Sequence, residues 1–246
     1  GVQRLGMESW IETQFSAPES PISDAPADVT NLTTVQQEFF YNAMNGGDQL
    51  RQRVAFALSK IWVVSGARFN DPAAIVPYLR VLQKHAFGNY YDLMSEITLN
   101  PAMGRYLDMA NNVKPNPALG RSANENYARE LLQLFTIGTY ELNPDGSRRM
   151  DGQGRPIQAY GQPEIVGFAR AFTGWTYPPV PGQASGARNP VRYDGPMVPF
   201  AANHDTGEKM LLGGTLLPAG QSPEKDLAGA LSNVFHHPNV GPFIGK

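Results

Sequence analysis

The chain has 246 residues, of which 41% are hydrophobic and 17% are charged, and its formal net charge is −2. This balance is typical of a globular protein and excludes intrinsic disorder. No basic block occurs, which excludes nucleic-acid binding through a concentrated Lys/Arg face. The absence of cysteine excludes disulfides, thiol catalysis and cysteine-ligated zinc.

Helical periodicity dominates the chain from its first residues. The helix starting at Gln49 is apolar nearly all round from Val54 to Val64, which predicts a central, buried helix with Asp48 as its N-cap. Its apolar run is interrupted by Ser59 and Lys60, and it is shorter than the roughly 20 residues that span a bilayer, so we expect no transmembrane segment. Helices are predicted over 7–16, 35–44, 49–65, 71–88, 89–98, 101–110, 124–138, 162–177 and 222–237.

Long irregular loops are predicted between residues 139 and 221, where glycine and proline are frequent and 140–161 could fold into one small β-hairpin. No alternation of strands and helices occurs. The sequence therefore predicts an all-α fold, a multi-helix globular domain with long irregular loops, over 1–246. The chain opens without an initiator methionine or an apolar leader and ends among apolar residues, so we expect a fragment of a longer protein.

The stretch NENYARELLQLFTIG, residues 124–138, begins with an unusual density of polar side chains. Ser122 and Glu125 fit a capping box, and Glu125 precedes Arg129 by four residues in the favourable order for an ion pair. The apolar arc of this helix is broad, so Arg129 and Glu130 are expected to be partly buried and to pair with Arg51 and Arg53. Capping plus an amphipathic stripe is one interpretation, and a polar site joining two helices is the other.

Five motifs occur in order: LRQRVAFALSKIWVVS, NENYARELLQLFTIG, ARAFTGWTY, HDTGEKMLLGG and NVFHHPNVGPFIGK. Over residues 45–246 the chain thereby resembles the bacterial family catalogued as domain of unknown function 1800. The resemblance implies an exported protein of the periplasm or extracellular space, often encoded beside a family that resembles exported sulfatases. The family carries no assigned catalytic role. Its motif positions here are Arg51, Arg53, Asn124, Glu125, Tyr127, Arg129, Glu130, Trp175, His204, Asp205, Gly207 and Lys209.

The loop NHDTGEK contains the strongest candidate site residues, His204 and Asp205, with Lys209 close by. Histidine titrates near physiological pH and serves as a base or a metal ligand. The functional interpretation folds this loop over Glu130 and Arg129. In the alternative, Asp205 forms an Asx-turn and His204 packs at the base of the loop.

A calcium site is a second candidate, because Glu141, Asn143 and Asp145 followed by Gly146 match the opening of an EF-type loop. The position that should hold a bidentate glutamate is Gly152, so an ordinary NPDG turn remains the alternative.

The long loops also carry aromatic rings that could form a platform for a polymer or could pin the loops to the core. They are Trp175, Tyr177, Tyr193 and Phe200.

Two functions remain open. The first is a non-catalytic module of the envelope or extracellular space that binds a polymer or a protein through 139–221. The second is an exported hydrolase-like enzyme built from His204, Asp205, Glu125, Arg129 and Glu130. We favour the first, because four histidines and no cysteine do not supply a complete catalytic set.

Overall fold

The computed structural model describes residues 2–24 and 28–246 and divides the chain into two compact units, Gly1–Ala102 and Met103–Lys246. Helices dominate both units, as predicted, and the described residues add only two short antiparallel strand pairs. Within those ranges, no helix combines the length and the apolar character that crossing a membrane requires.

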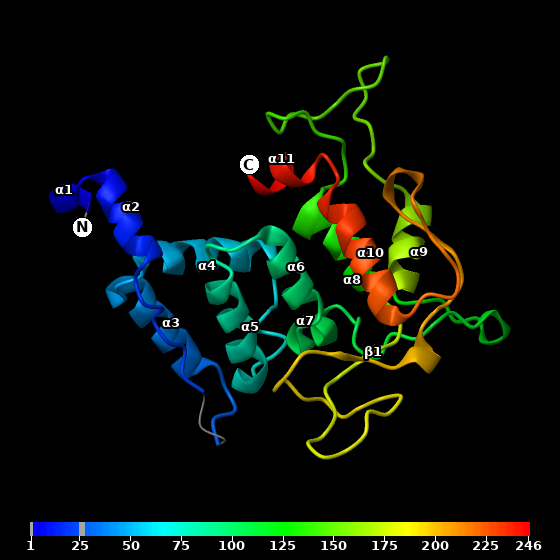
Figure 1. Ribbon diagram of the computed structural model, residues 1–246, viewed down its shortest axis with the longest axis horizontal. Coiled ribbons are helices and arrows are strands. Elements are labelled where there is room, and N and C mark those ends of the chain that lie inside the picture. Colours follow the sequence, from blue (N-terminus) through cyan, green and yellow to red (C-terminus); the bar gives the residue numbers. More distant parts are fainter. Residues whose placement is uncertain (1, 25–27) are drawn as a thin grey trace. The chain divides into compact units, whose positions relative to one another are not determined.

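The first unit consists of helices joined by irregular segments (Figure 1). Helix α4 packs against α2, α3 and α5, and α5 packs against α6. The start of α5 is built as its sequence suggests, because the Asp71 carboxylate accepts a hydrogen bond from the Ala73 N–H and Pro72 occupies the first turn. The helices are α1 Val2–Leu5, α2 Met7–Phe15, α3 Thr33–Asn45, α4 Gln49–Ile61, α5 Pro72–Lys84 and α6 Tyr90–Thr98.

The prediction that the helix starting at Gln49 is central and buried is wrong. Only Gln52 and Ala55 of α4 are buried, and the ring of Phe56 is 43% exposed. Apolar periodicity could not reveal this, because it shows which side chains are apolar and not which neighbours pack against them; in this unit the neighbours of α4 are α2, α3 and α5. Asp48 does occupy the N-cap position, but its carboxylate binds Ser20 and Gln52 instead of the helix N–H groups.

The second unit is built around a helix that covers 126–136 and ends at Gly138, whose φ of 71° suits glycine. This helix packs against α9, α10 and α11, and its inner face includes Tyr127, Leu131 and Phe135. The helices are α7 Pro101–Tyr106, which crosses the unit boundary, η1 Pro117–Leu119, α8 Asn126–Glu130, the π-helix η2 Leu131–Thr136, α9 Gln162–Ala171, η3 Ala201–Asn203, η4 Leu212–Gly214, α10 Pro223–Phe235 and α11 Val240–Ile244.

Short strands fix the long loops to these helices. Strand β1 (Trp175–Thr176) pairs with β2 (Val198–Pro199), and β3 (Lys209–Met210) pairs with β4 (Leu216–Leu217). Strand β3 lies against α9, which in turn packs against α10. The residues after His204 are therefore held against α9.

A small hairpin is predicted for the segment 139–161. Its first part is bonded to the residues that flank α11, because the Leu142 N–H donates to Asn239 and Lys246 donates to the Gly146 carbonyl, and its remaining part extends outward from the helices of its unit (Figure 1). The segment forms three short stretches joined by a ring of backbone hydrogen bonds: the Glu141 N–H donates to Ile157, the Ile157 N–H to Arg149 and the Arg149 N–H to Glu141. Isolated bridges connect Leu142 with Arg148 and Met150 with Pro156. The segment 139–161 thus folds as three short extended stretches connected by two tight turns, and we call it the meander.

Candidate functional site

The polar start of the 126–136 helix is capped differently from the prediction. The side chain of Asn124 accepts the Asn126 N–H, and the Glu125 side chain makes no cap hydrogen bond, so the predicted Ser122–Glu125 capping box is wrong. The predicted ion pair between Glu125 and Arg129 is confirmed, with 2.7 Å between Oε2 and Nη2. Gln162 donates to both carboxylate oxygens of Glu125 at 2.9 Å.

Glu130 is the ionisable group with unmet hydrogen-bonding capacity in this region. Its Oε2 atom is buried and has no hydrogen-bond partner in the described chain. Burial raises the pKa of the Glu130 carboxyl, and the positive charge of Arg129 offsets only part of that rise. Burial likewise raises the pKa of Tyr160 to about 12, with Arg129 opposing and Glu130 adding to the shift.

These side chains form a continuous polar region, which we call the Glu130 surface. It is supplied by α8, by the end of the meander and by the start of α9, and it comprises Glu125, Arg129, Glu130, Tyr160 and Gln162.

A π-helix begins directly after Glu130 and runs over Leu131–Thr136. Its wider turn lets the Thr136 hydroxyl donate to the Leu131 carbonyl, five residues back. π-Helical turns within longer helices are rare and occur preferentially at functional sites. The unusual backbone geometry and the unpartnered carboxylate are therefore adjacent in the chain.

Arg129 is partly buried, as predicted, with 42% of its side chain exposed. Replacing Arg129 with alanine is expected to lower the free energy of unfolding by less than about 1 kcal/mol, as is usual for partly exposed ion pairs. Urea unfolding of the two proteins measures this difference. A loss of several kcal/mol would show that the guanidinium has a buried role that its exposure does not reveal.

The pairing of Arg51 and Arg53 with Arg129 and Glu130 remains a prediction, and the contacts described for Arg51 are with residues of its own unit. The Arg51 guanidinium donates to the Gln83 carbonyl at 3.0 Å, lies 3.8 Å from Asp48 and stacks over the Phe87 ring, all within the first unit. Arg53 is exposed. The sequence could not identify these partners, because Gln83 and Phe87 are more than one helix away from Arg51 in the chain.

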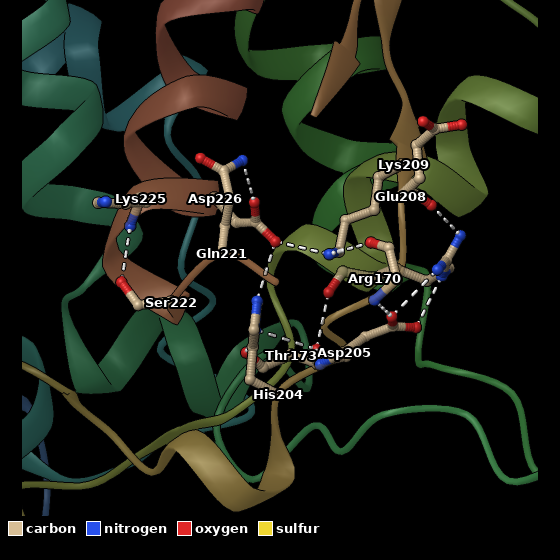
Figure 2. Close-up of polar contacts among 11 residues, drawn as sticks. Arg170, Thr173, His204, Asp205, Glu208, Lys209, Gln221, Ser222, Lys225 and Asp226 are labelled. Atoms are coloured by element: carbon tan, nitrogen blue, oxygen red, sulfur yellow. Dashed lines mark hydrogen bonds and ion pairs between the residues drawn. The ribbon is translucent and has the colours of Figure 1, made fainter. Parts of the chain in front are cut away.

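His204 is completely buried, whereas the functional interpretation requires a histidine on an accessible loop. Its Nδ1 atom lies 2.8 Å from the Thr173 carbonyl oxygen, and its Nε2 atom lies 2.9 Å from Oδ2 of Asp226 (Figure 2). Both ring nitrogens thus lie within hydrogen-bond distance of an oxygen atom.

Lys209 is also buried, with 1% of its surface exposed, and its Nζ atom lies 2.6 Å from the same Oδ2 of Asp226. Nζ donates in addition to the Gly207 carbonyl at 2.8 Å, and Gln221 donates to Oδ1 of Asp226 at 2.8 Å. We call His204, Lys209, Gln221 and Asp226 the Asp226 cluster (Figure 2).

Sequence reasoning missed Asp226, although a signal was present. Asp226 occupies the buried face of α10, four residues before Ala230 and eight before Val234. An acid at an apolar position of an amphipathic helix must be paired inside the protein. Its partners, however, are 17 and 22 residues away, and the helical period says nothing about them.

Asp205 points away from the Asp226 cluster and pairs with Arg170 of α9 through two hydrogen bonds of 2.7 and 3.0 Å. It also accepts the Gly207 N–H, so the predicted Asx-turn alternative is confirmed. Burial tends to raise the pKa of Asp205, but the hydrogen bonds and charge of Arg170 outweigh it and lower the pKa. In the described chain, the hydrogen bonds of His204 and Asp205 do not reach Glu130.

The side chains proposed for calcium are engaged with neighbours in their own turn. Glu141 pairs with Arg149, the Asn143 amide donates to the Ser147 hydroxyl, and Asp145 accepts both the N–H and the O–H of Ser147. The described residues contain no group of three or more His, Asp or Glu side chains suited to a metal ion. Calcium binding remains a prediction.

The aromatic residues of the long loops anchor them to the protein. Trp175 is 4% exposed and belongs to β1, and Tyr177, which follows β1 directly, is 5% exposed. Tyr193 and Phe200 are half-buried. The structure favours the interpretation in which these rings attach the loops to the core over the one in which they form a binding platform. Trp175 in particular is too buried to stack against a ligand.

Comparison with known proteins adds a family and no activity. No curated protein and no solved structure matches the chain. A family model described as "Protein of unknown function (DUF1800)" matches residues 1–246, the whole chain. With the five ordered motifs and the helical fold, this match shows that the chain belongs to the DUF1800 family.

Proposed function

We propose that the chain is a non-catalytic binding module that holds a hydroxyl-bearing polymer, such as a polysaccharide, at the Glu130 surface. The location we propose, the periplasm or the extracellular space, rests on the family resemblance. The observation that carries the proposal is the buried, unpartnered Oε2 atom of Glu130. A buried acceptor without a donor is costly, and a rotation of the partly exposed Glu130 side chain toward the surface would let a ligand hydroxyl or amide supply that donor.

The rest of the surface suits a neutral polar ligand better than a protein partner. Glu125 is bonded to Arg129 and Gln162, and the opposite charges of Glu125 and Arg129 cancel. The three side chains can therefore offer further hydrogen bonds to a ligand without a net charge. Tyr160 adds a phenol beside Glu130. Protein partners are usually anchored by buried aromatic or aliphatic side chains, and the Glu130 surface offers only Tyr160. An exported sulfatase-like partner remains an expectation from the family resemblance.

Co-sedimentation with purified peptidoglycan, cellulose and chitin tests this proposal. We expect the protein to bind at least one of these polymers and the Glu130→Gln variant to bind it about tenfold more weakly, because a hydrogen bond to a charged group contributes about 1.5–3 kcal/mol. Glu208→Gln is the matched control, since Glu208 is exposed and outside the Glu130 surface. Equal binding by both variants, or no binding of any polymer, would contradict the proposal.

The same variant has an expected effect on stability, with a sign that follows from the raised pKa of Glu130. A carboxyl whose pKa is higher in the folded state binds its proton more tightly there, so stability falls as pH rises from the unfolded to the folded pKa. The penalty is therefore larger at neutral pH than in acid. Glu130→Gln should therefore raise the free energy of unfolding at pH 7, by less than about 1 kcal/mol because the group is partly exposed.

Chemical denaturation at pH 7 and at pH 3.5 measures this effect. The gain at pH 7 should disappear at pH 3.5, where Glu130 is protonated in both states. A variant that is less stable than the natural protein at pH 7 would show that the carboxylate has a stabilising partner. Gained stability together with lost binding would identify Glu130 as a group retained for function at a cost to folding.

A second candidate function is hydrolysis with Glu130 as the general acid, because a raised carboxyl pKa is what that role requires. A glycosidase would need a second carboxylate, and Glu125 is already bonded to Arg129 and Gln162. Release of reducing ends from whichever polymer is bound distinguishes the two functions. A steady release that Glu130→Gln abolishes would favour the enzyme.

A further inference from the structure

The Asp226 cluster places an amine and a carboxylate in direct contact without access to water. Nζ of Lys209 lies 2.6 Å from Oδ2 of Asp226, and both side chains have 0% relative exposure. Removing two charges from water carries a penalty of several kcal/mol per ion, which mutual attraction repays only in part. The contact has no role in the proposed binding of a polymer at the Glu130 surface.

We propose that Lys209 and Asp226 condense to form an intramolecular amide bond between Nζ and Cγ. The ammonium first transfers a proton to Oδ2, across the 2.6 Å contact, which leaves a neutral amine and a carboxylic acid. The amine lone pair then attacks Cγ. The Nζ–Cγ bond forms, the Cγ–Oδ2 bond breaks, and Oδ2 leaves as water with the two protons that Nζ loses, so the step involves no oxidation or reduction.

The neighbours of Asp226 occupy the positions that this reaction needs. His204 Nε2, 2.9 Å from Oδ2, can donate a proton to the departing oxygen and take one back from the nitrogen of the adduct. The Gln221 amide donates to Oδ1 at 2.8 Å, where negative charge develops in the tetrahedral intermediate. The Thr173 carbonyl, 2.8 Å from Nδ1, keeps the His204 ring in this orientation.

Burial changes the balance between the ion pair and the amide. In water, hydration stabilises the separate ammonium and carboxylate and so opposes condensation. Inside the protein that hydration is absent, whereas a neutral amide carries no buried charge. Condensation therefore replaces two buried charges with one neutral group.

A second lysine–carboxylate pair provides an internal comparison. Lys84 Nζ also lies 2.6 Å from a carboxylate oxygen, that of Glu96, but these side chains are 62% and 37% exposed. The contact distance is the same, and the solvation differs. Only the buried pair, Lys209 with Asp226, should condense.

Intact-mass measurement of the denatured natural protein tests the proposal. We expect a mass about 18 Da below that of the sequence, the loss of one water. A tryptic map should contain a branched peptide that joins 193–225 to 226–246, because an acylated Lys209 resists cleavage. Recovery of the full sequence mass with normal cleavage after Lys209 would overturn the proposal, and this result needs no variant to fold.

Variants and a chemical control exclude other losses of water. Lys209→Met should have its full calculated mass, whereas Lys84→Met and Lys225→Met should keep the loss. Asp-Gly sequences can also lose water, as succinimides, and the chain has three, at 145–146, 151–152 and 194–195. Hydroxylamine opens a succinimide and leaves an amide intact, so a loss reversed by hydroxylamine, or retained by Lys209→Met, counts against the proposal.

Discussion

Replacement of Asp226 by alanine is expected to lower the free energy of unfolding by about 3–5 kcal/mol. The carboxylate accepts hydrogen bonds from His204, Lys209 and Gln221, and it lies with His204 and Lys209 completely out of contact with solvent. The variant leaves these donors buried without their acceptor, which costs far more than the net value of the pair itself. Where the amide has formed, the variant also loses a cross-link that restricts the unfolded chain.

Urea unfolding, monitored by circular dichroism, measures the difference. Asp194→Ala is the matched control, because Asp194 also forms an ion pair, with Arg192, but is 55% exposed, and we expect a change of less than about 0.5 kcal/mol there. A loss below about 1 kcal/mol for Asp226→Ala would mean that water enters the cluster and hydrates the remaining charges.

Much of the fold follows from local sequence signals. Ser222 accepts the Lys225 N–H and Pro223 begins α10, because a side-chain oxygen followed by proline suits the first turn of a helix wherever it lies. Gly138 ends its helix for an equally local reason, its positive φ. These signals depend on residues within one turn of each other, so a single sequence contains them completely.

The candidate site depends on contacts that local patterns do not encode. The burial of His204 follows from the placement of its loop against α9 and α10, and its partners Thr173 and Asp226 are 31 and 22 residues away. A loop rich in glycine and polar residues is normally at the surface, so the sequence favoured an accessible histidine. The partial burial of Glu130, in contrast, could be predicted from local sequence, because it follows from the broad apolar arc of its own helix.

Replacement of Gly167 by alanine separates local from tertiary effects most clearly. Alanine in a helix interior is favoured over glycine by about 1 kcal/mol, so the sequence of α9 alone predicts a more stable protein. In the structure, an added Cβ would lie 1.8 Å from the Met210 carbonyl oxygen and 2.9 Å from its carbon, both backbone atoms of β3. No rotamer change can relieve this clash, so α9 and β3 must separate, and we expect a net loss of about 3 kcal/mol.

The control for this variant is Gly152→Ala, where an added Cβ meets no atom within 4 Å and the expected change stays within about 0.5 kcal/mol. Denaturant unfolding of both variants measures the two values, and a stabilised Gly167→Ala would show that the close approach of α9 to β3 is absent in solution. The variant also bears on the amide bond, because Lys209 is the first residue of β3. Displacing this strand should move Nζ away from Asp226, so the fraction of molecules that lack one water should fall in Gly167→Ala and stay unchanged in Gly152→Ala.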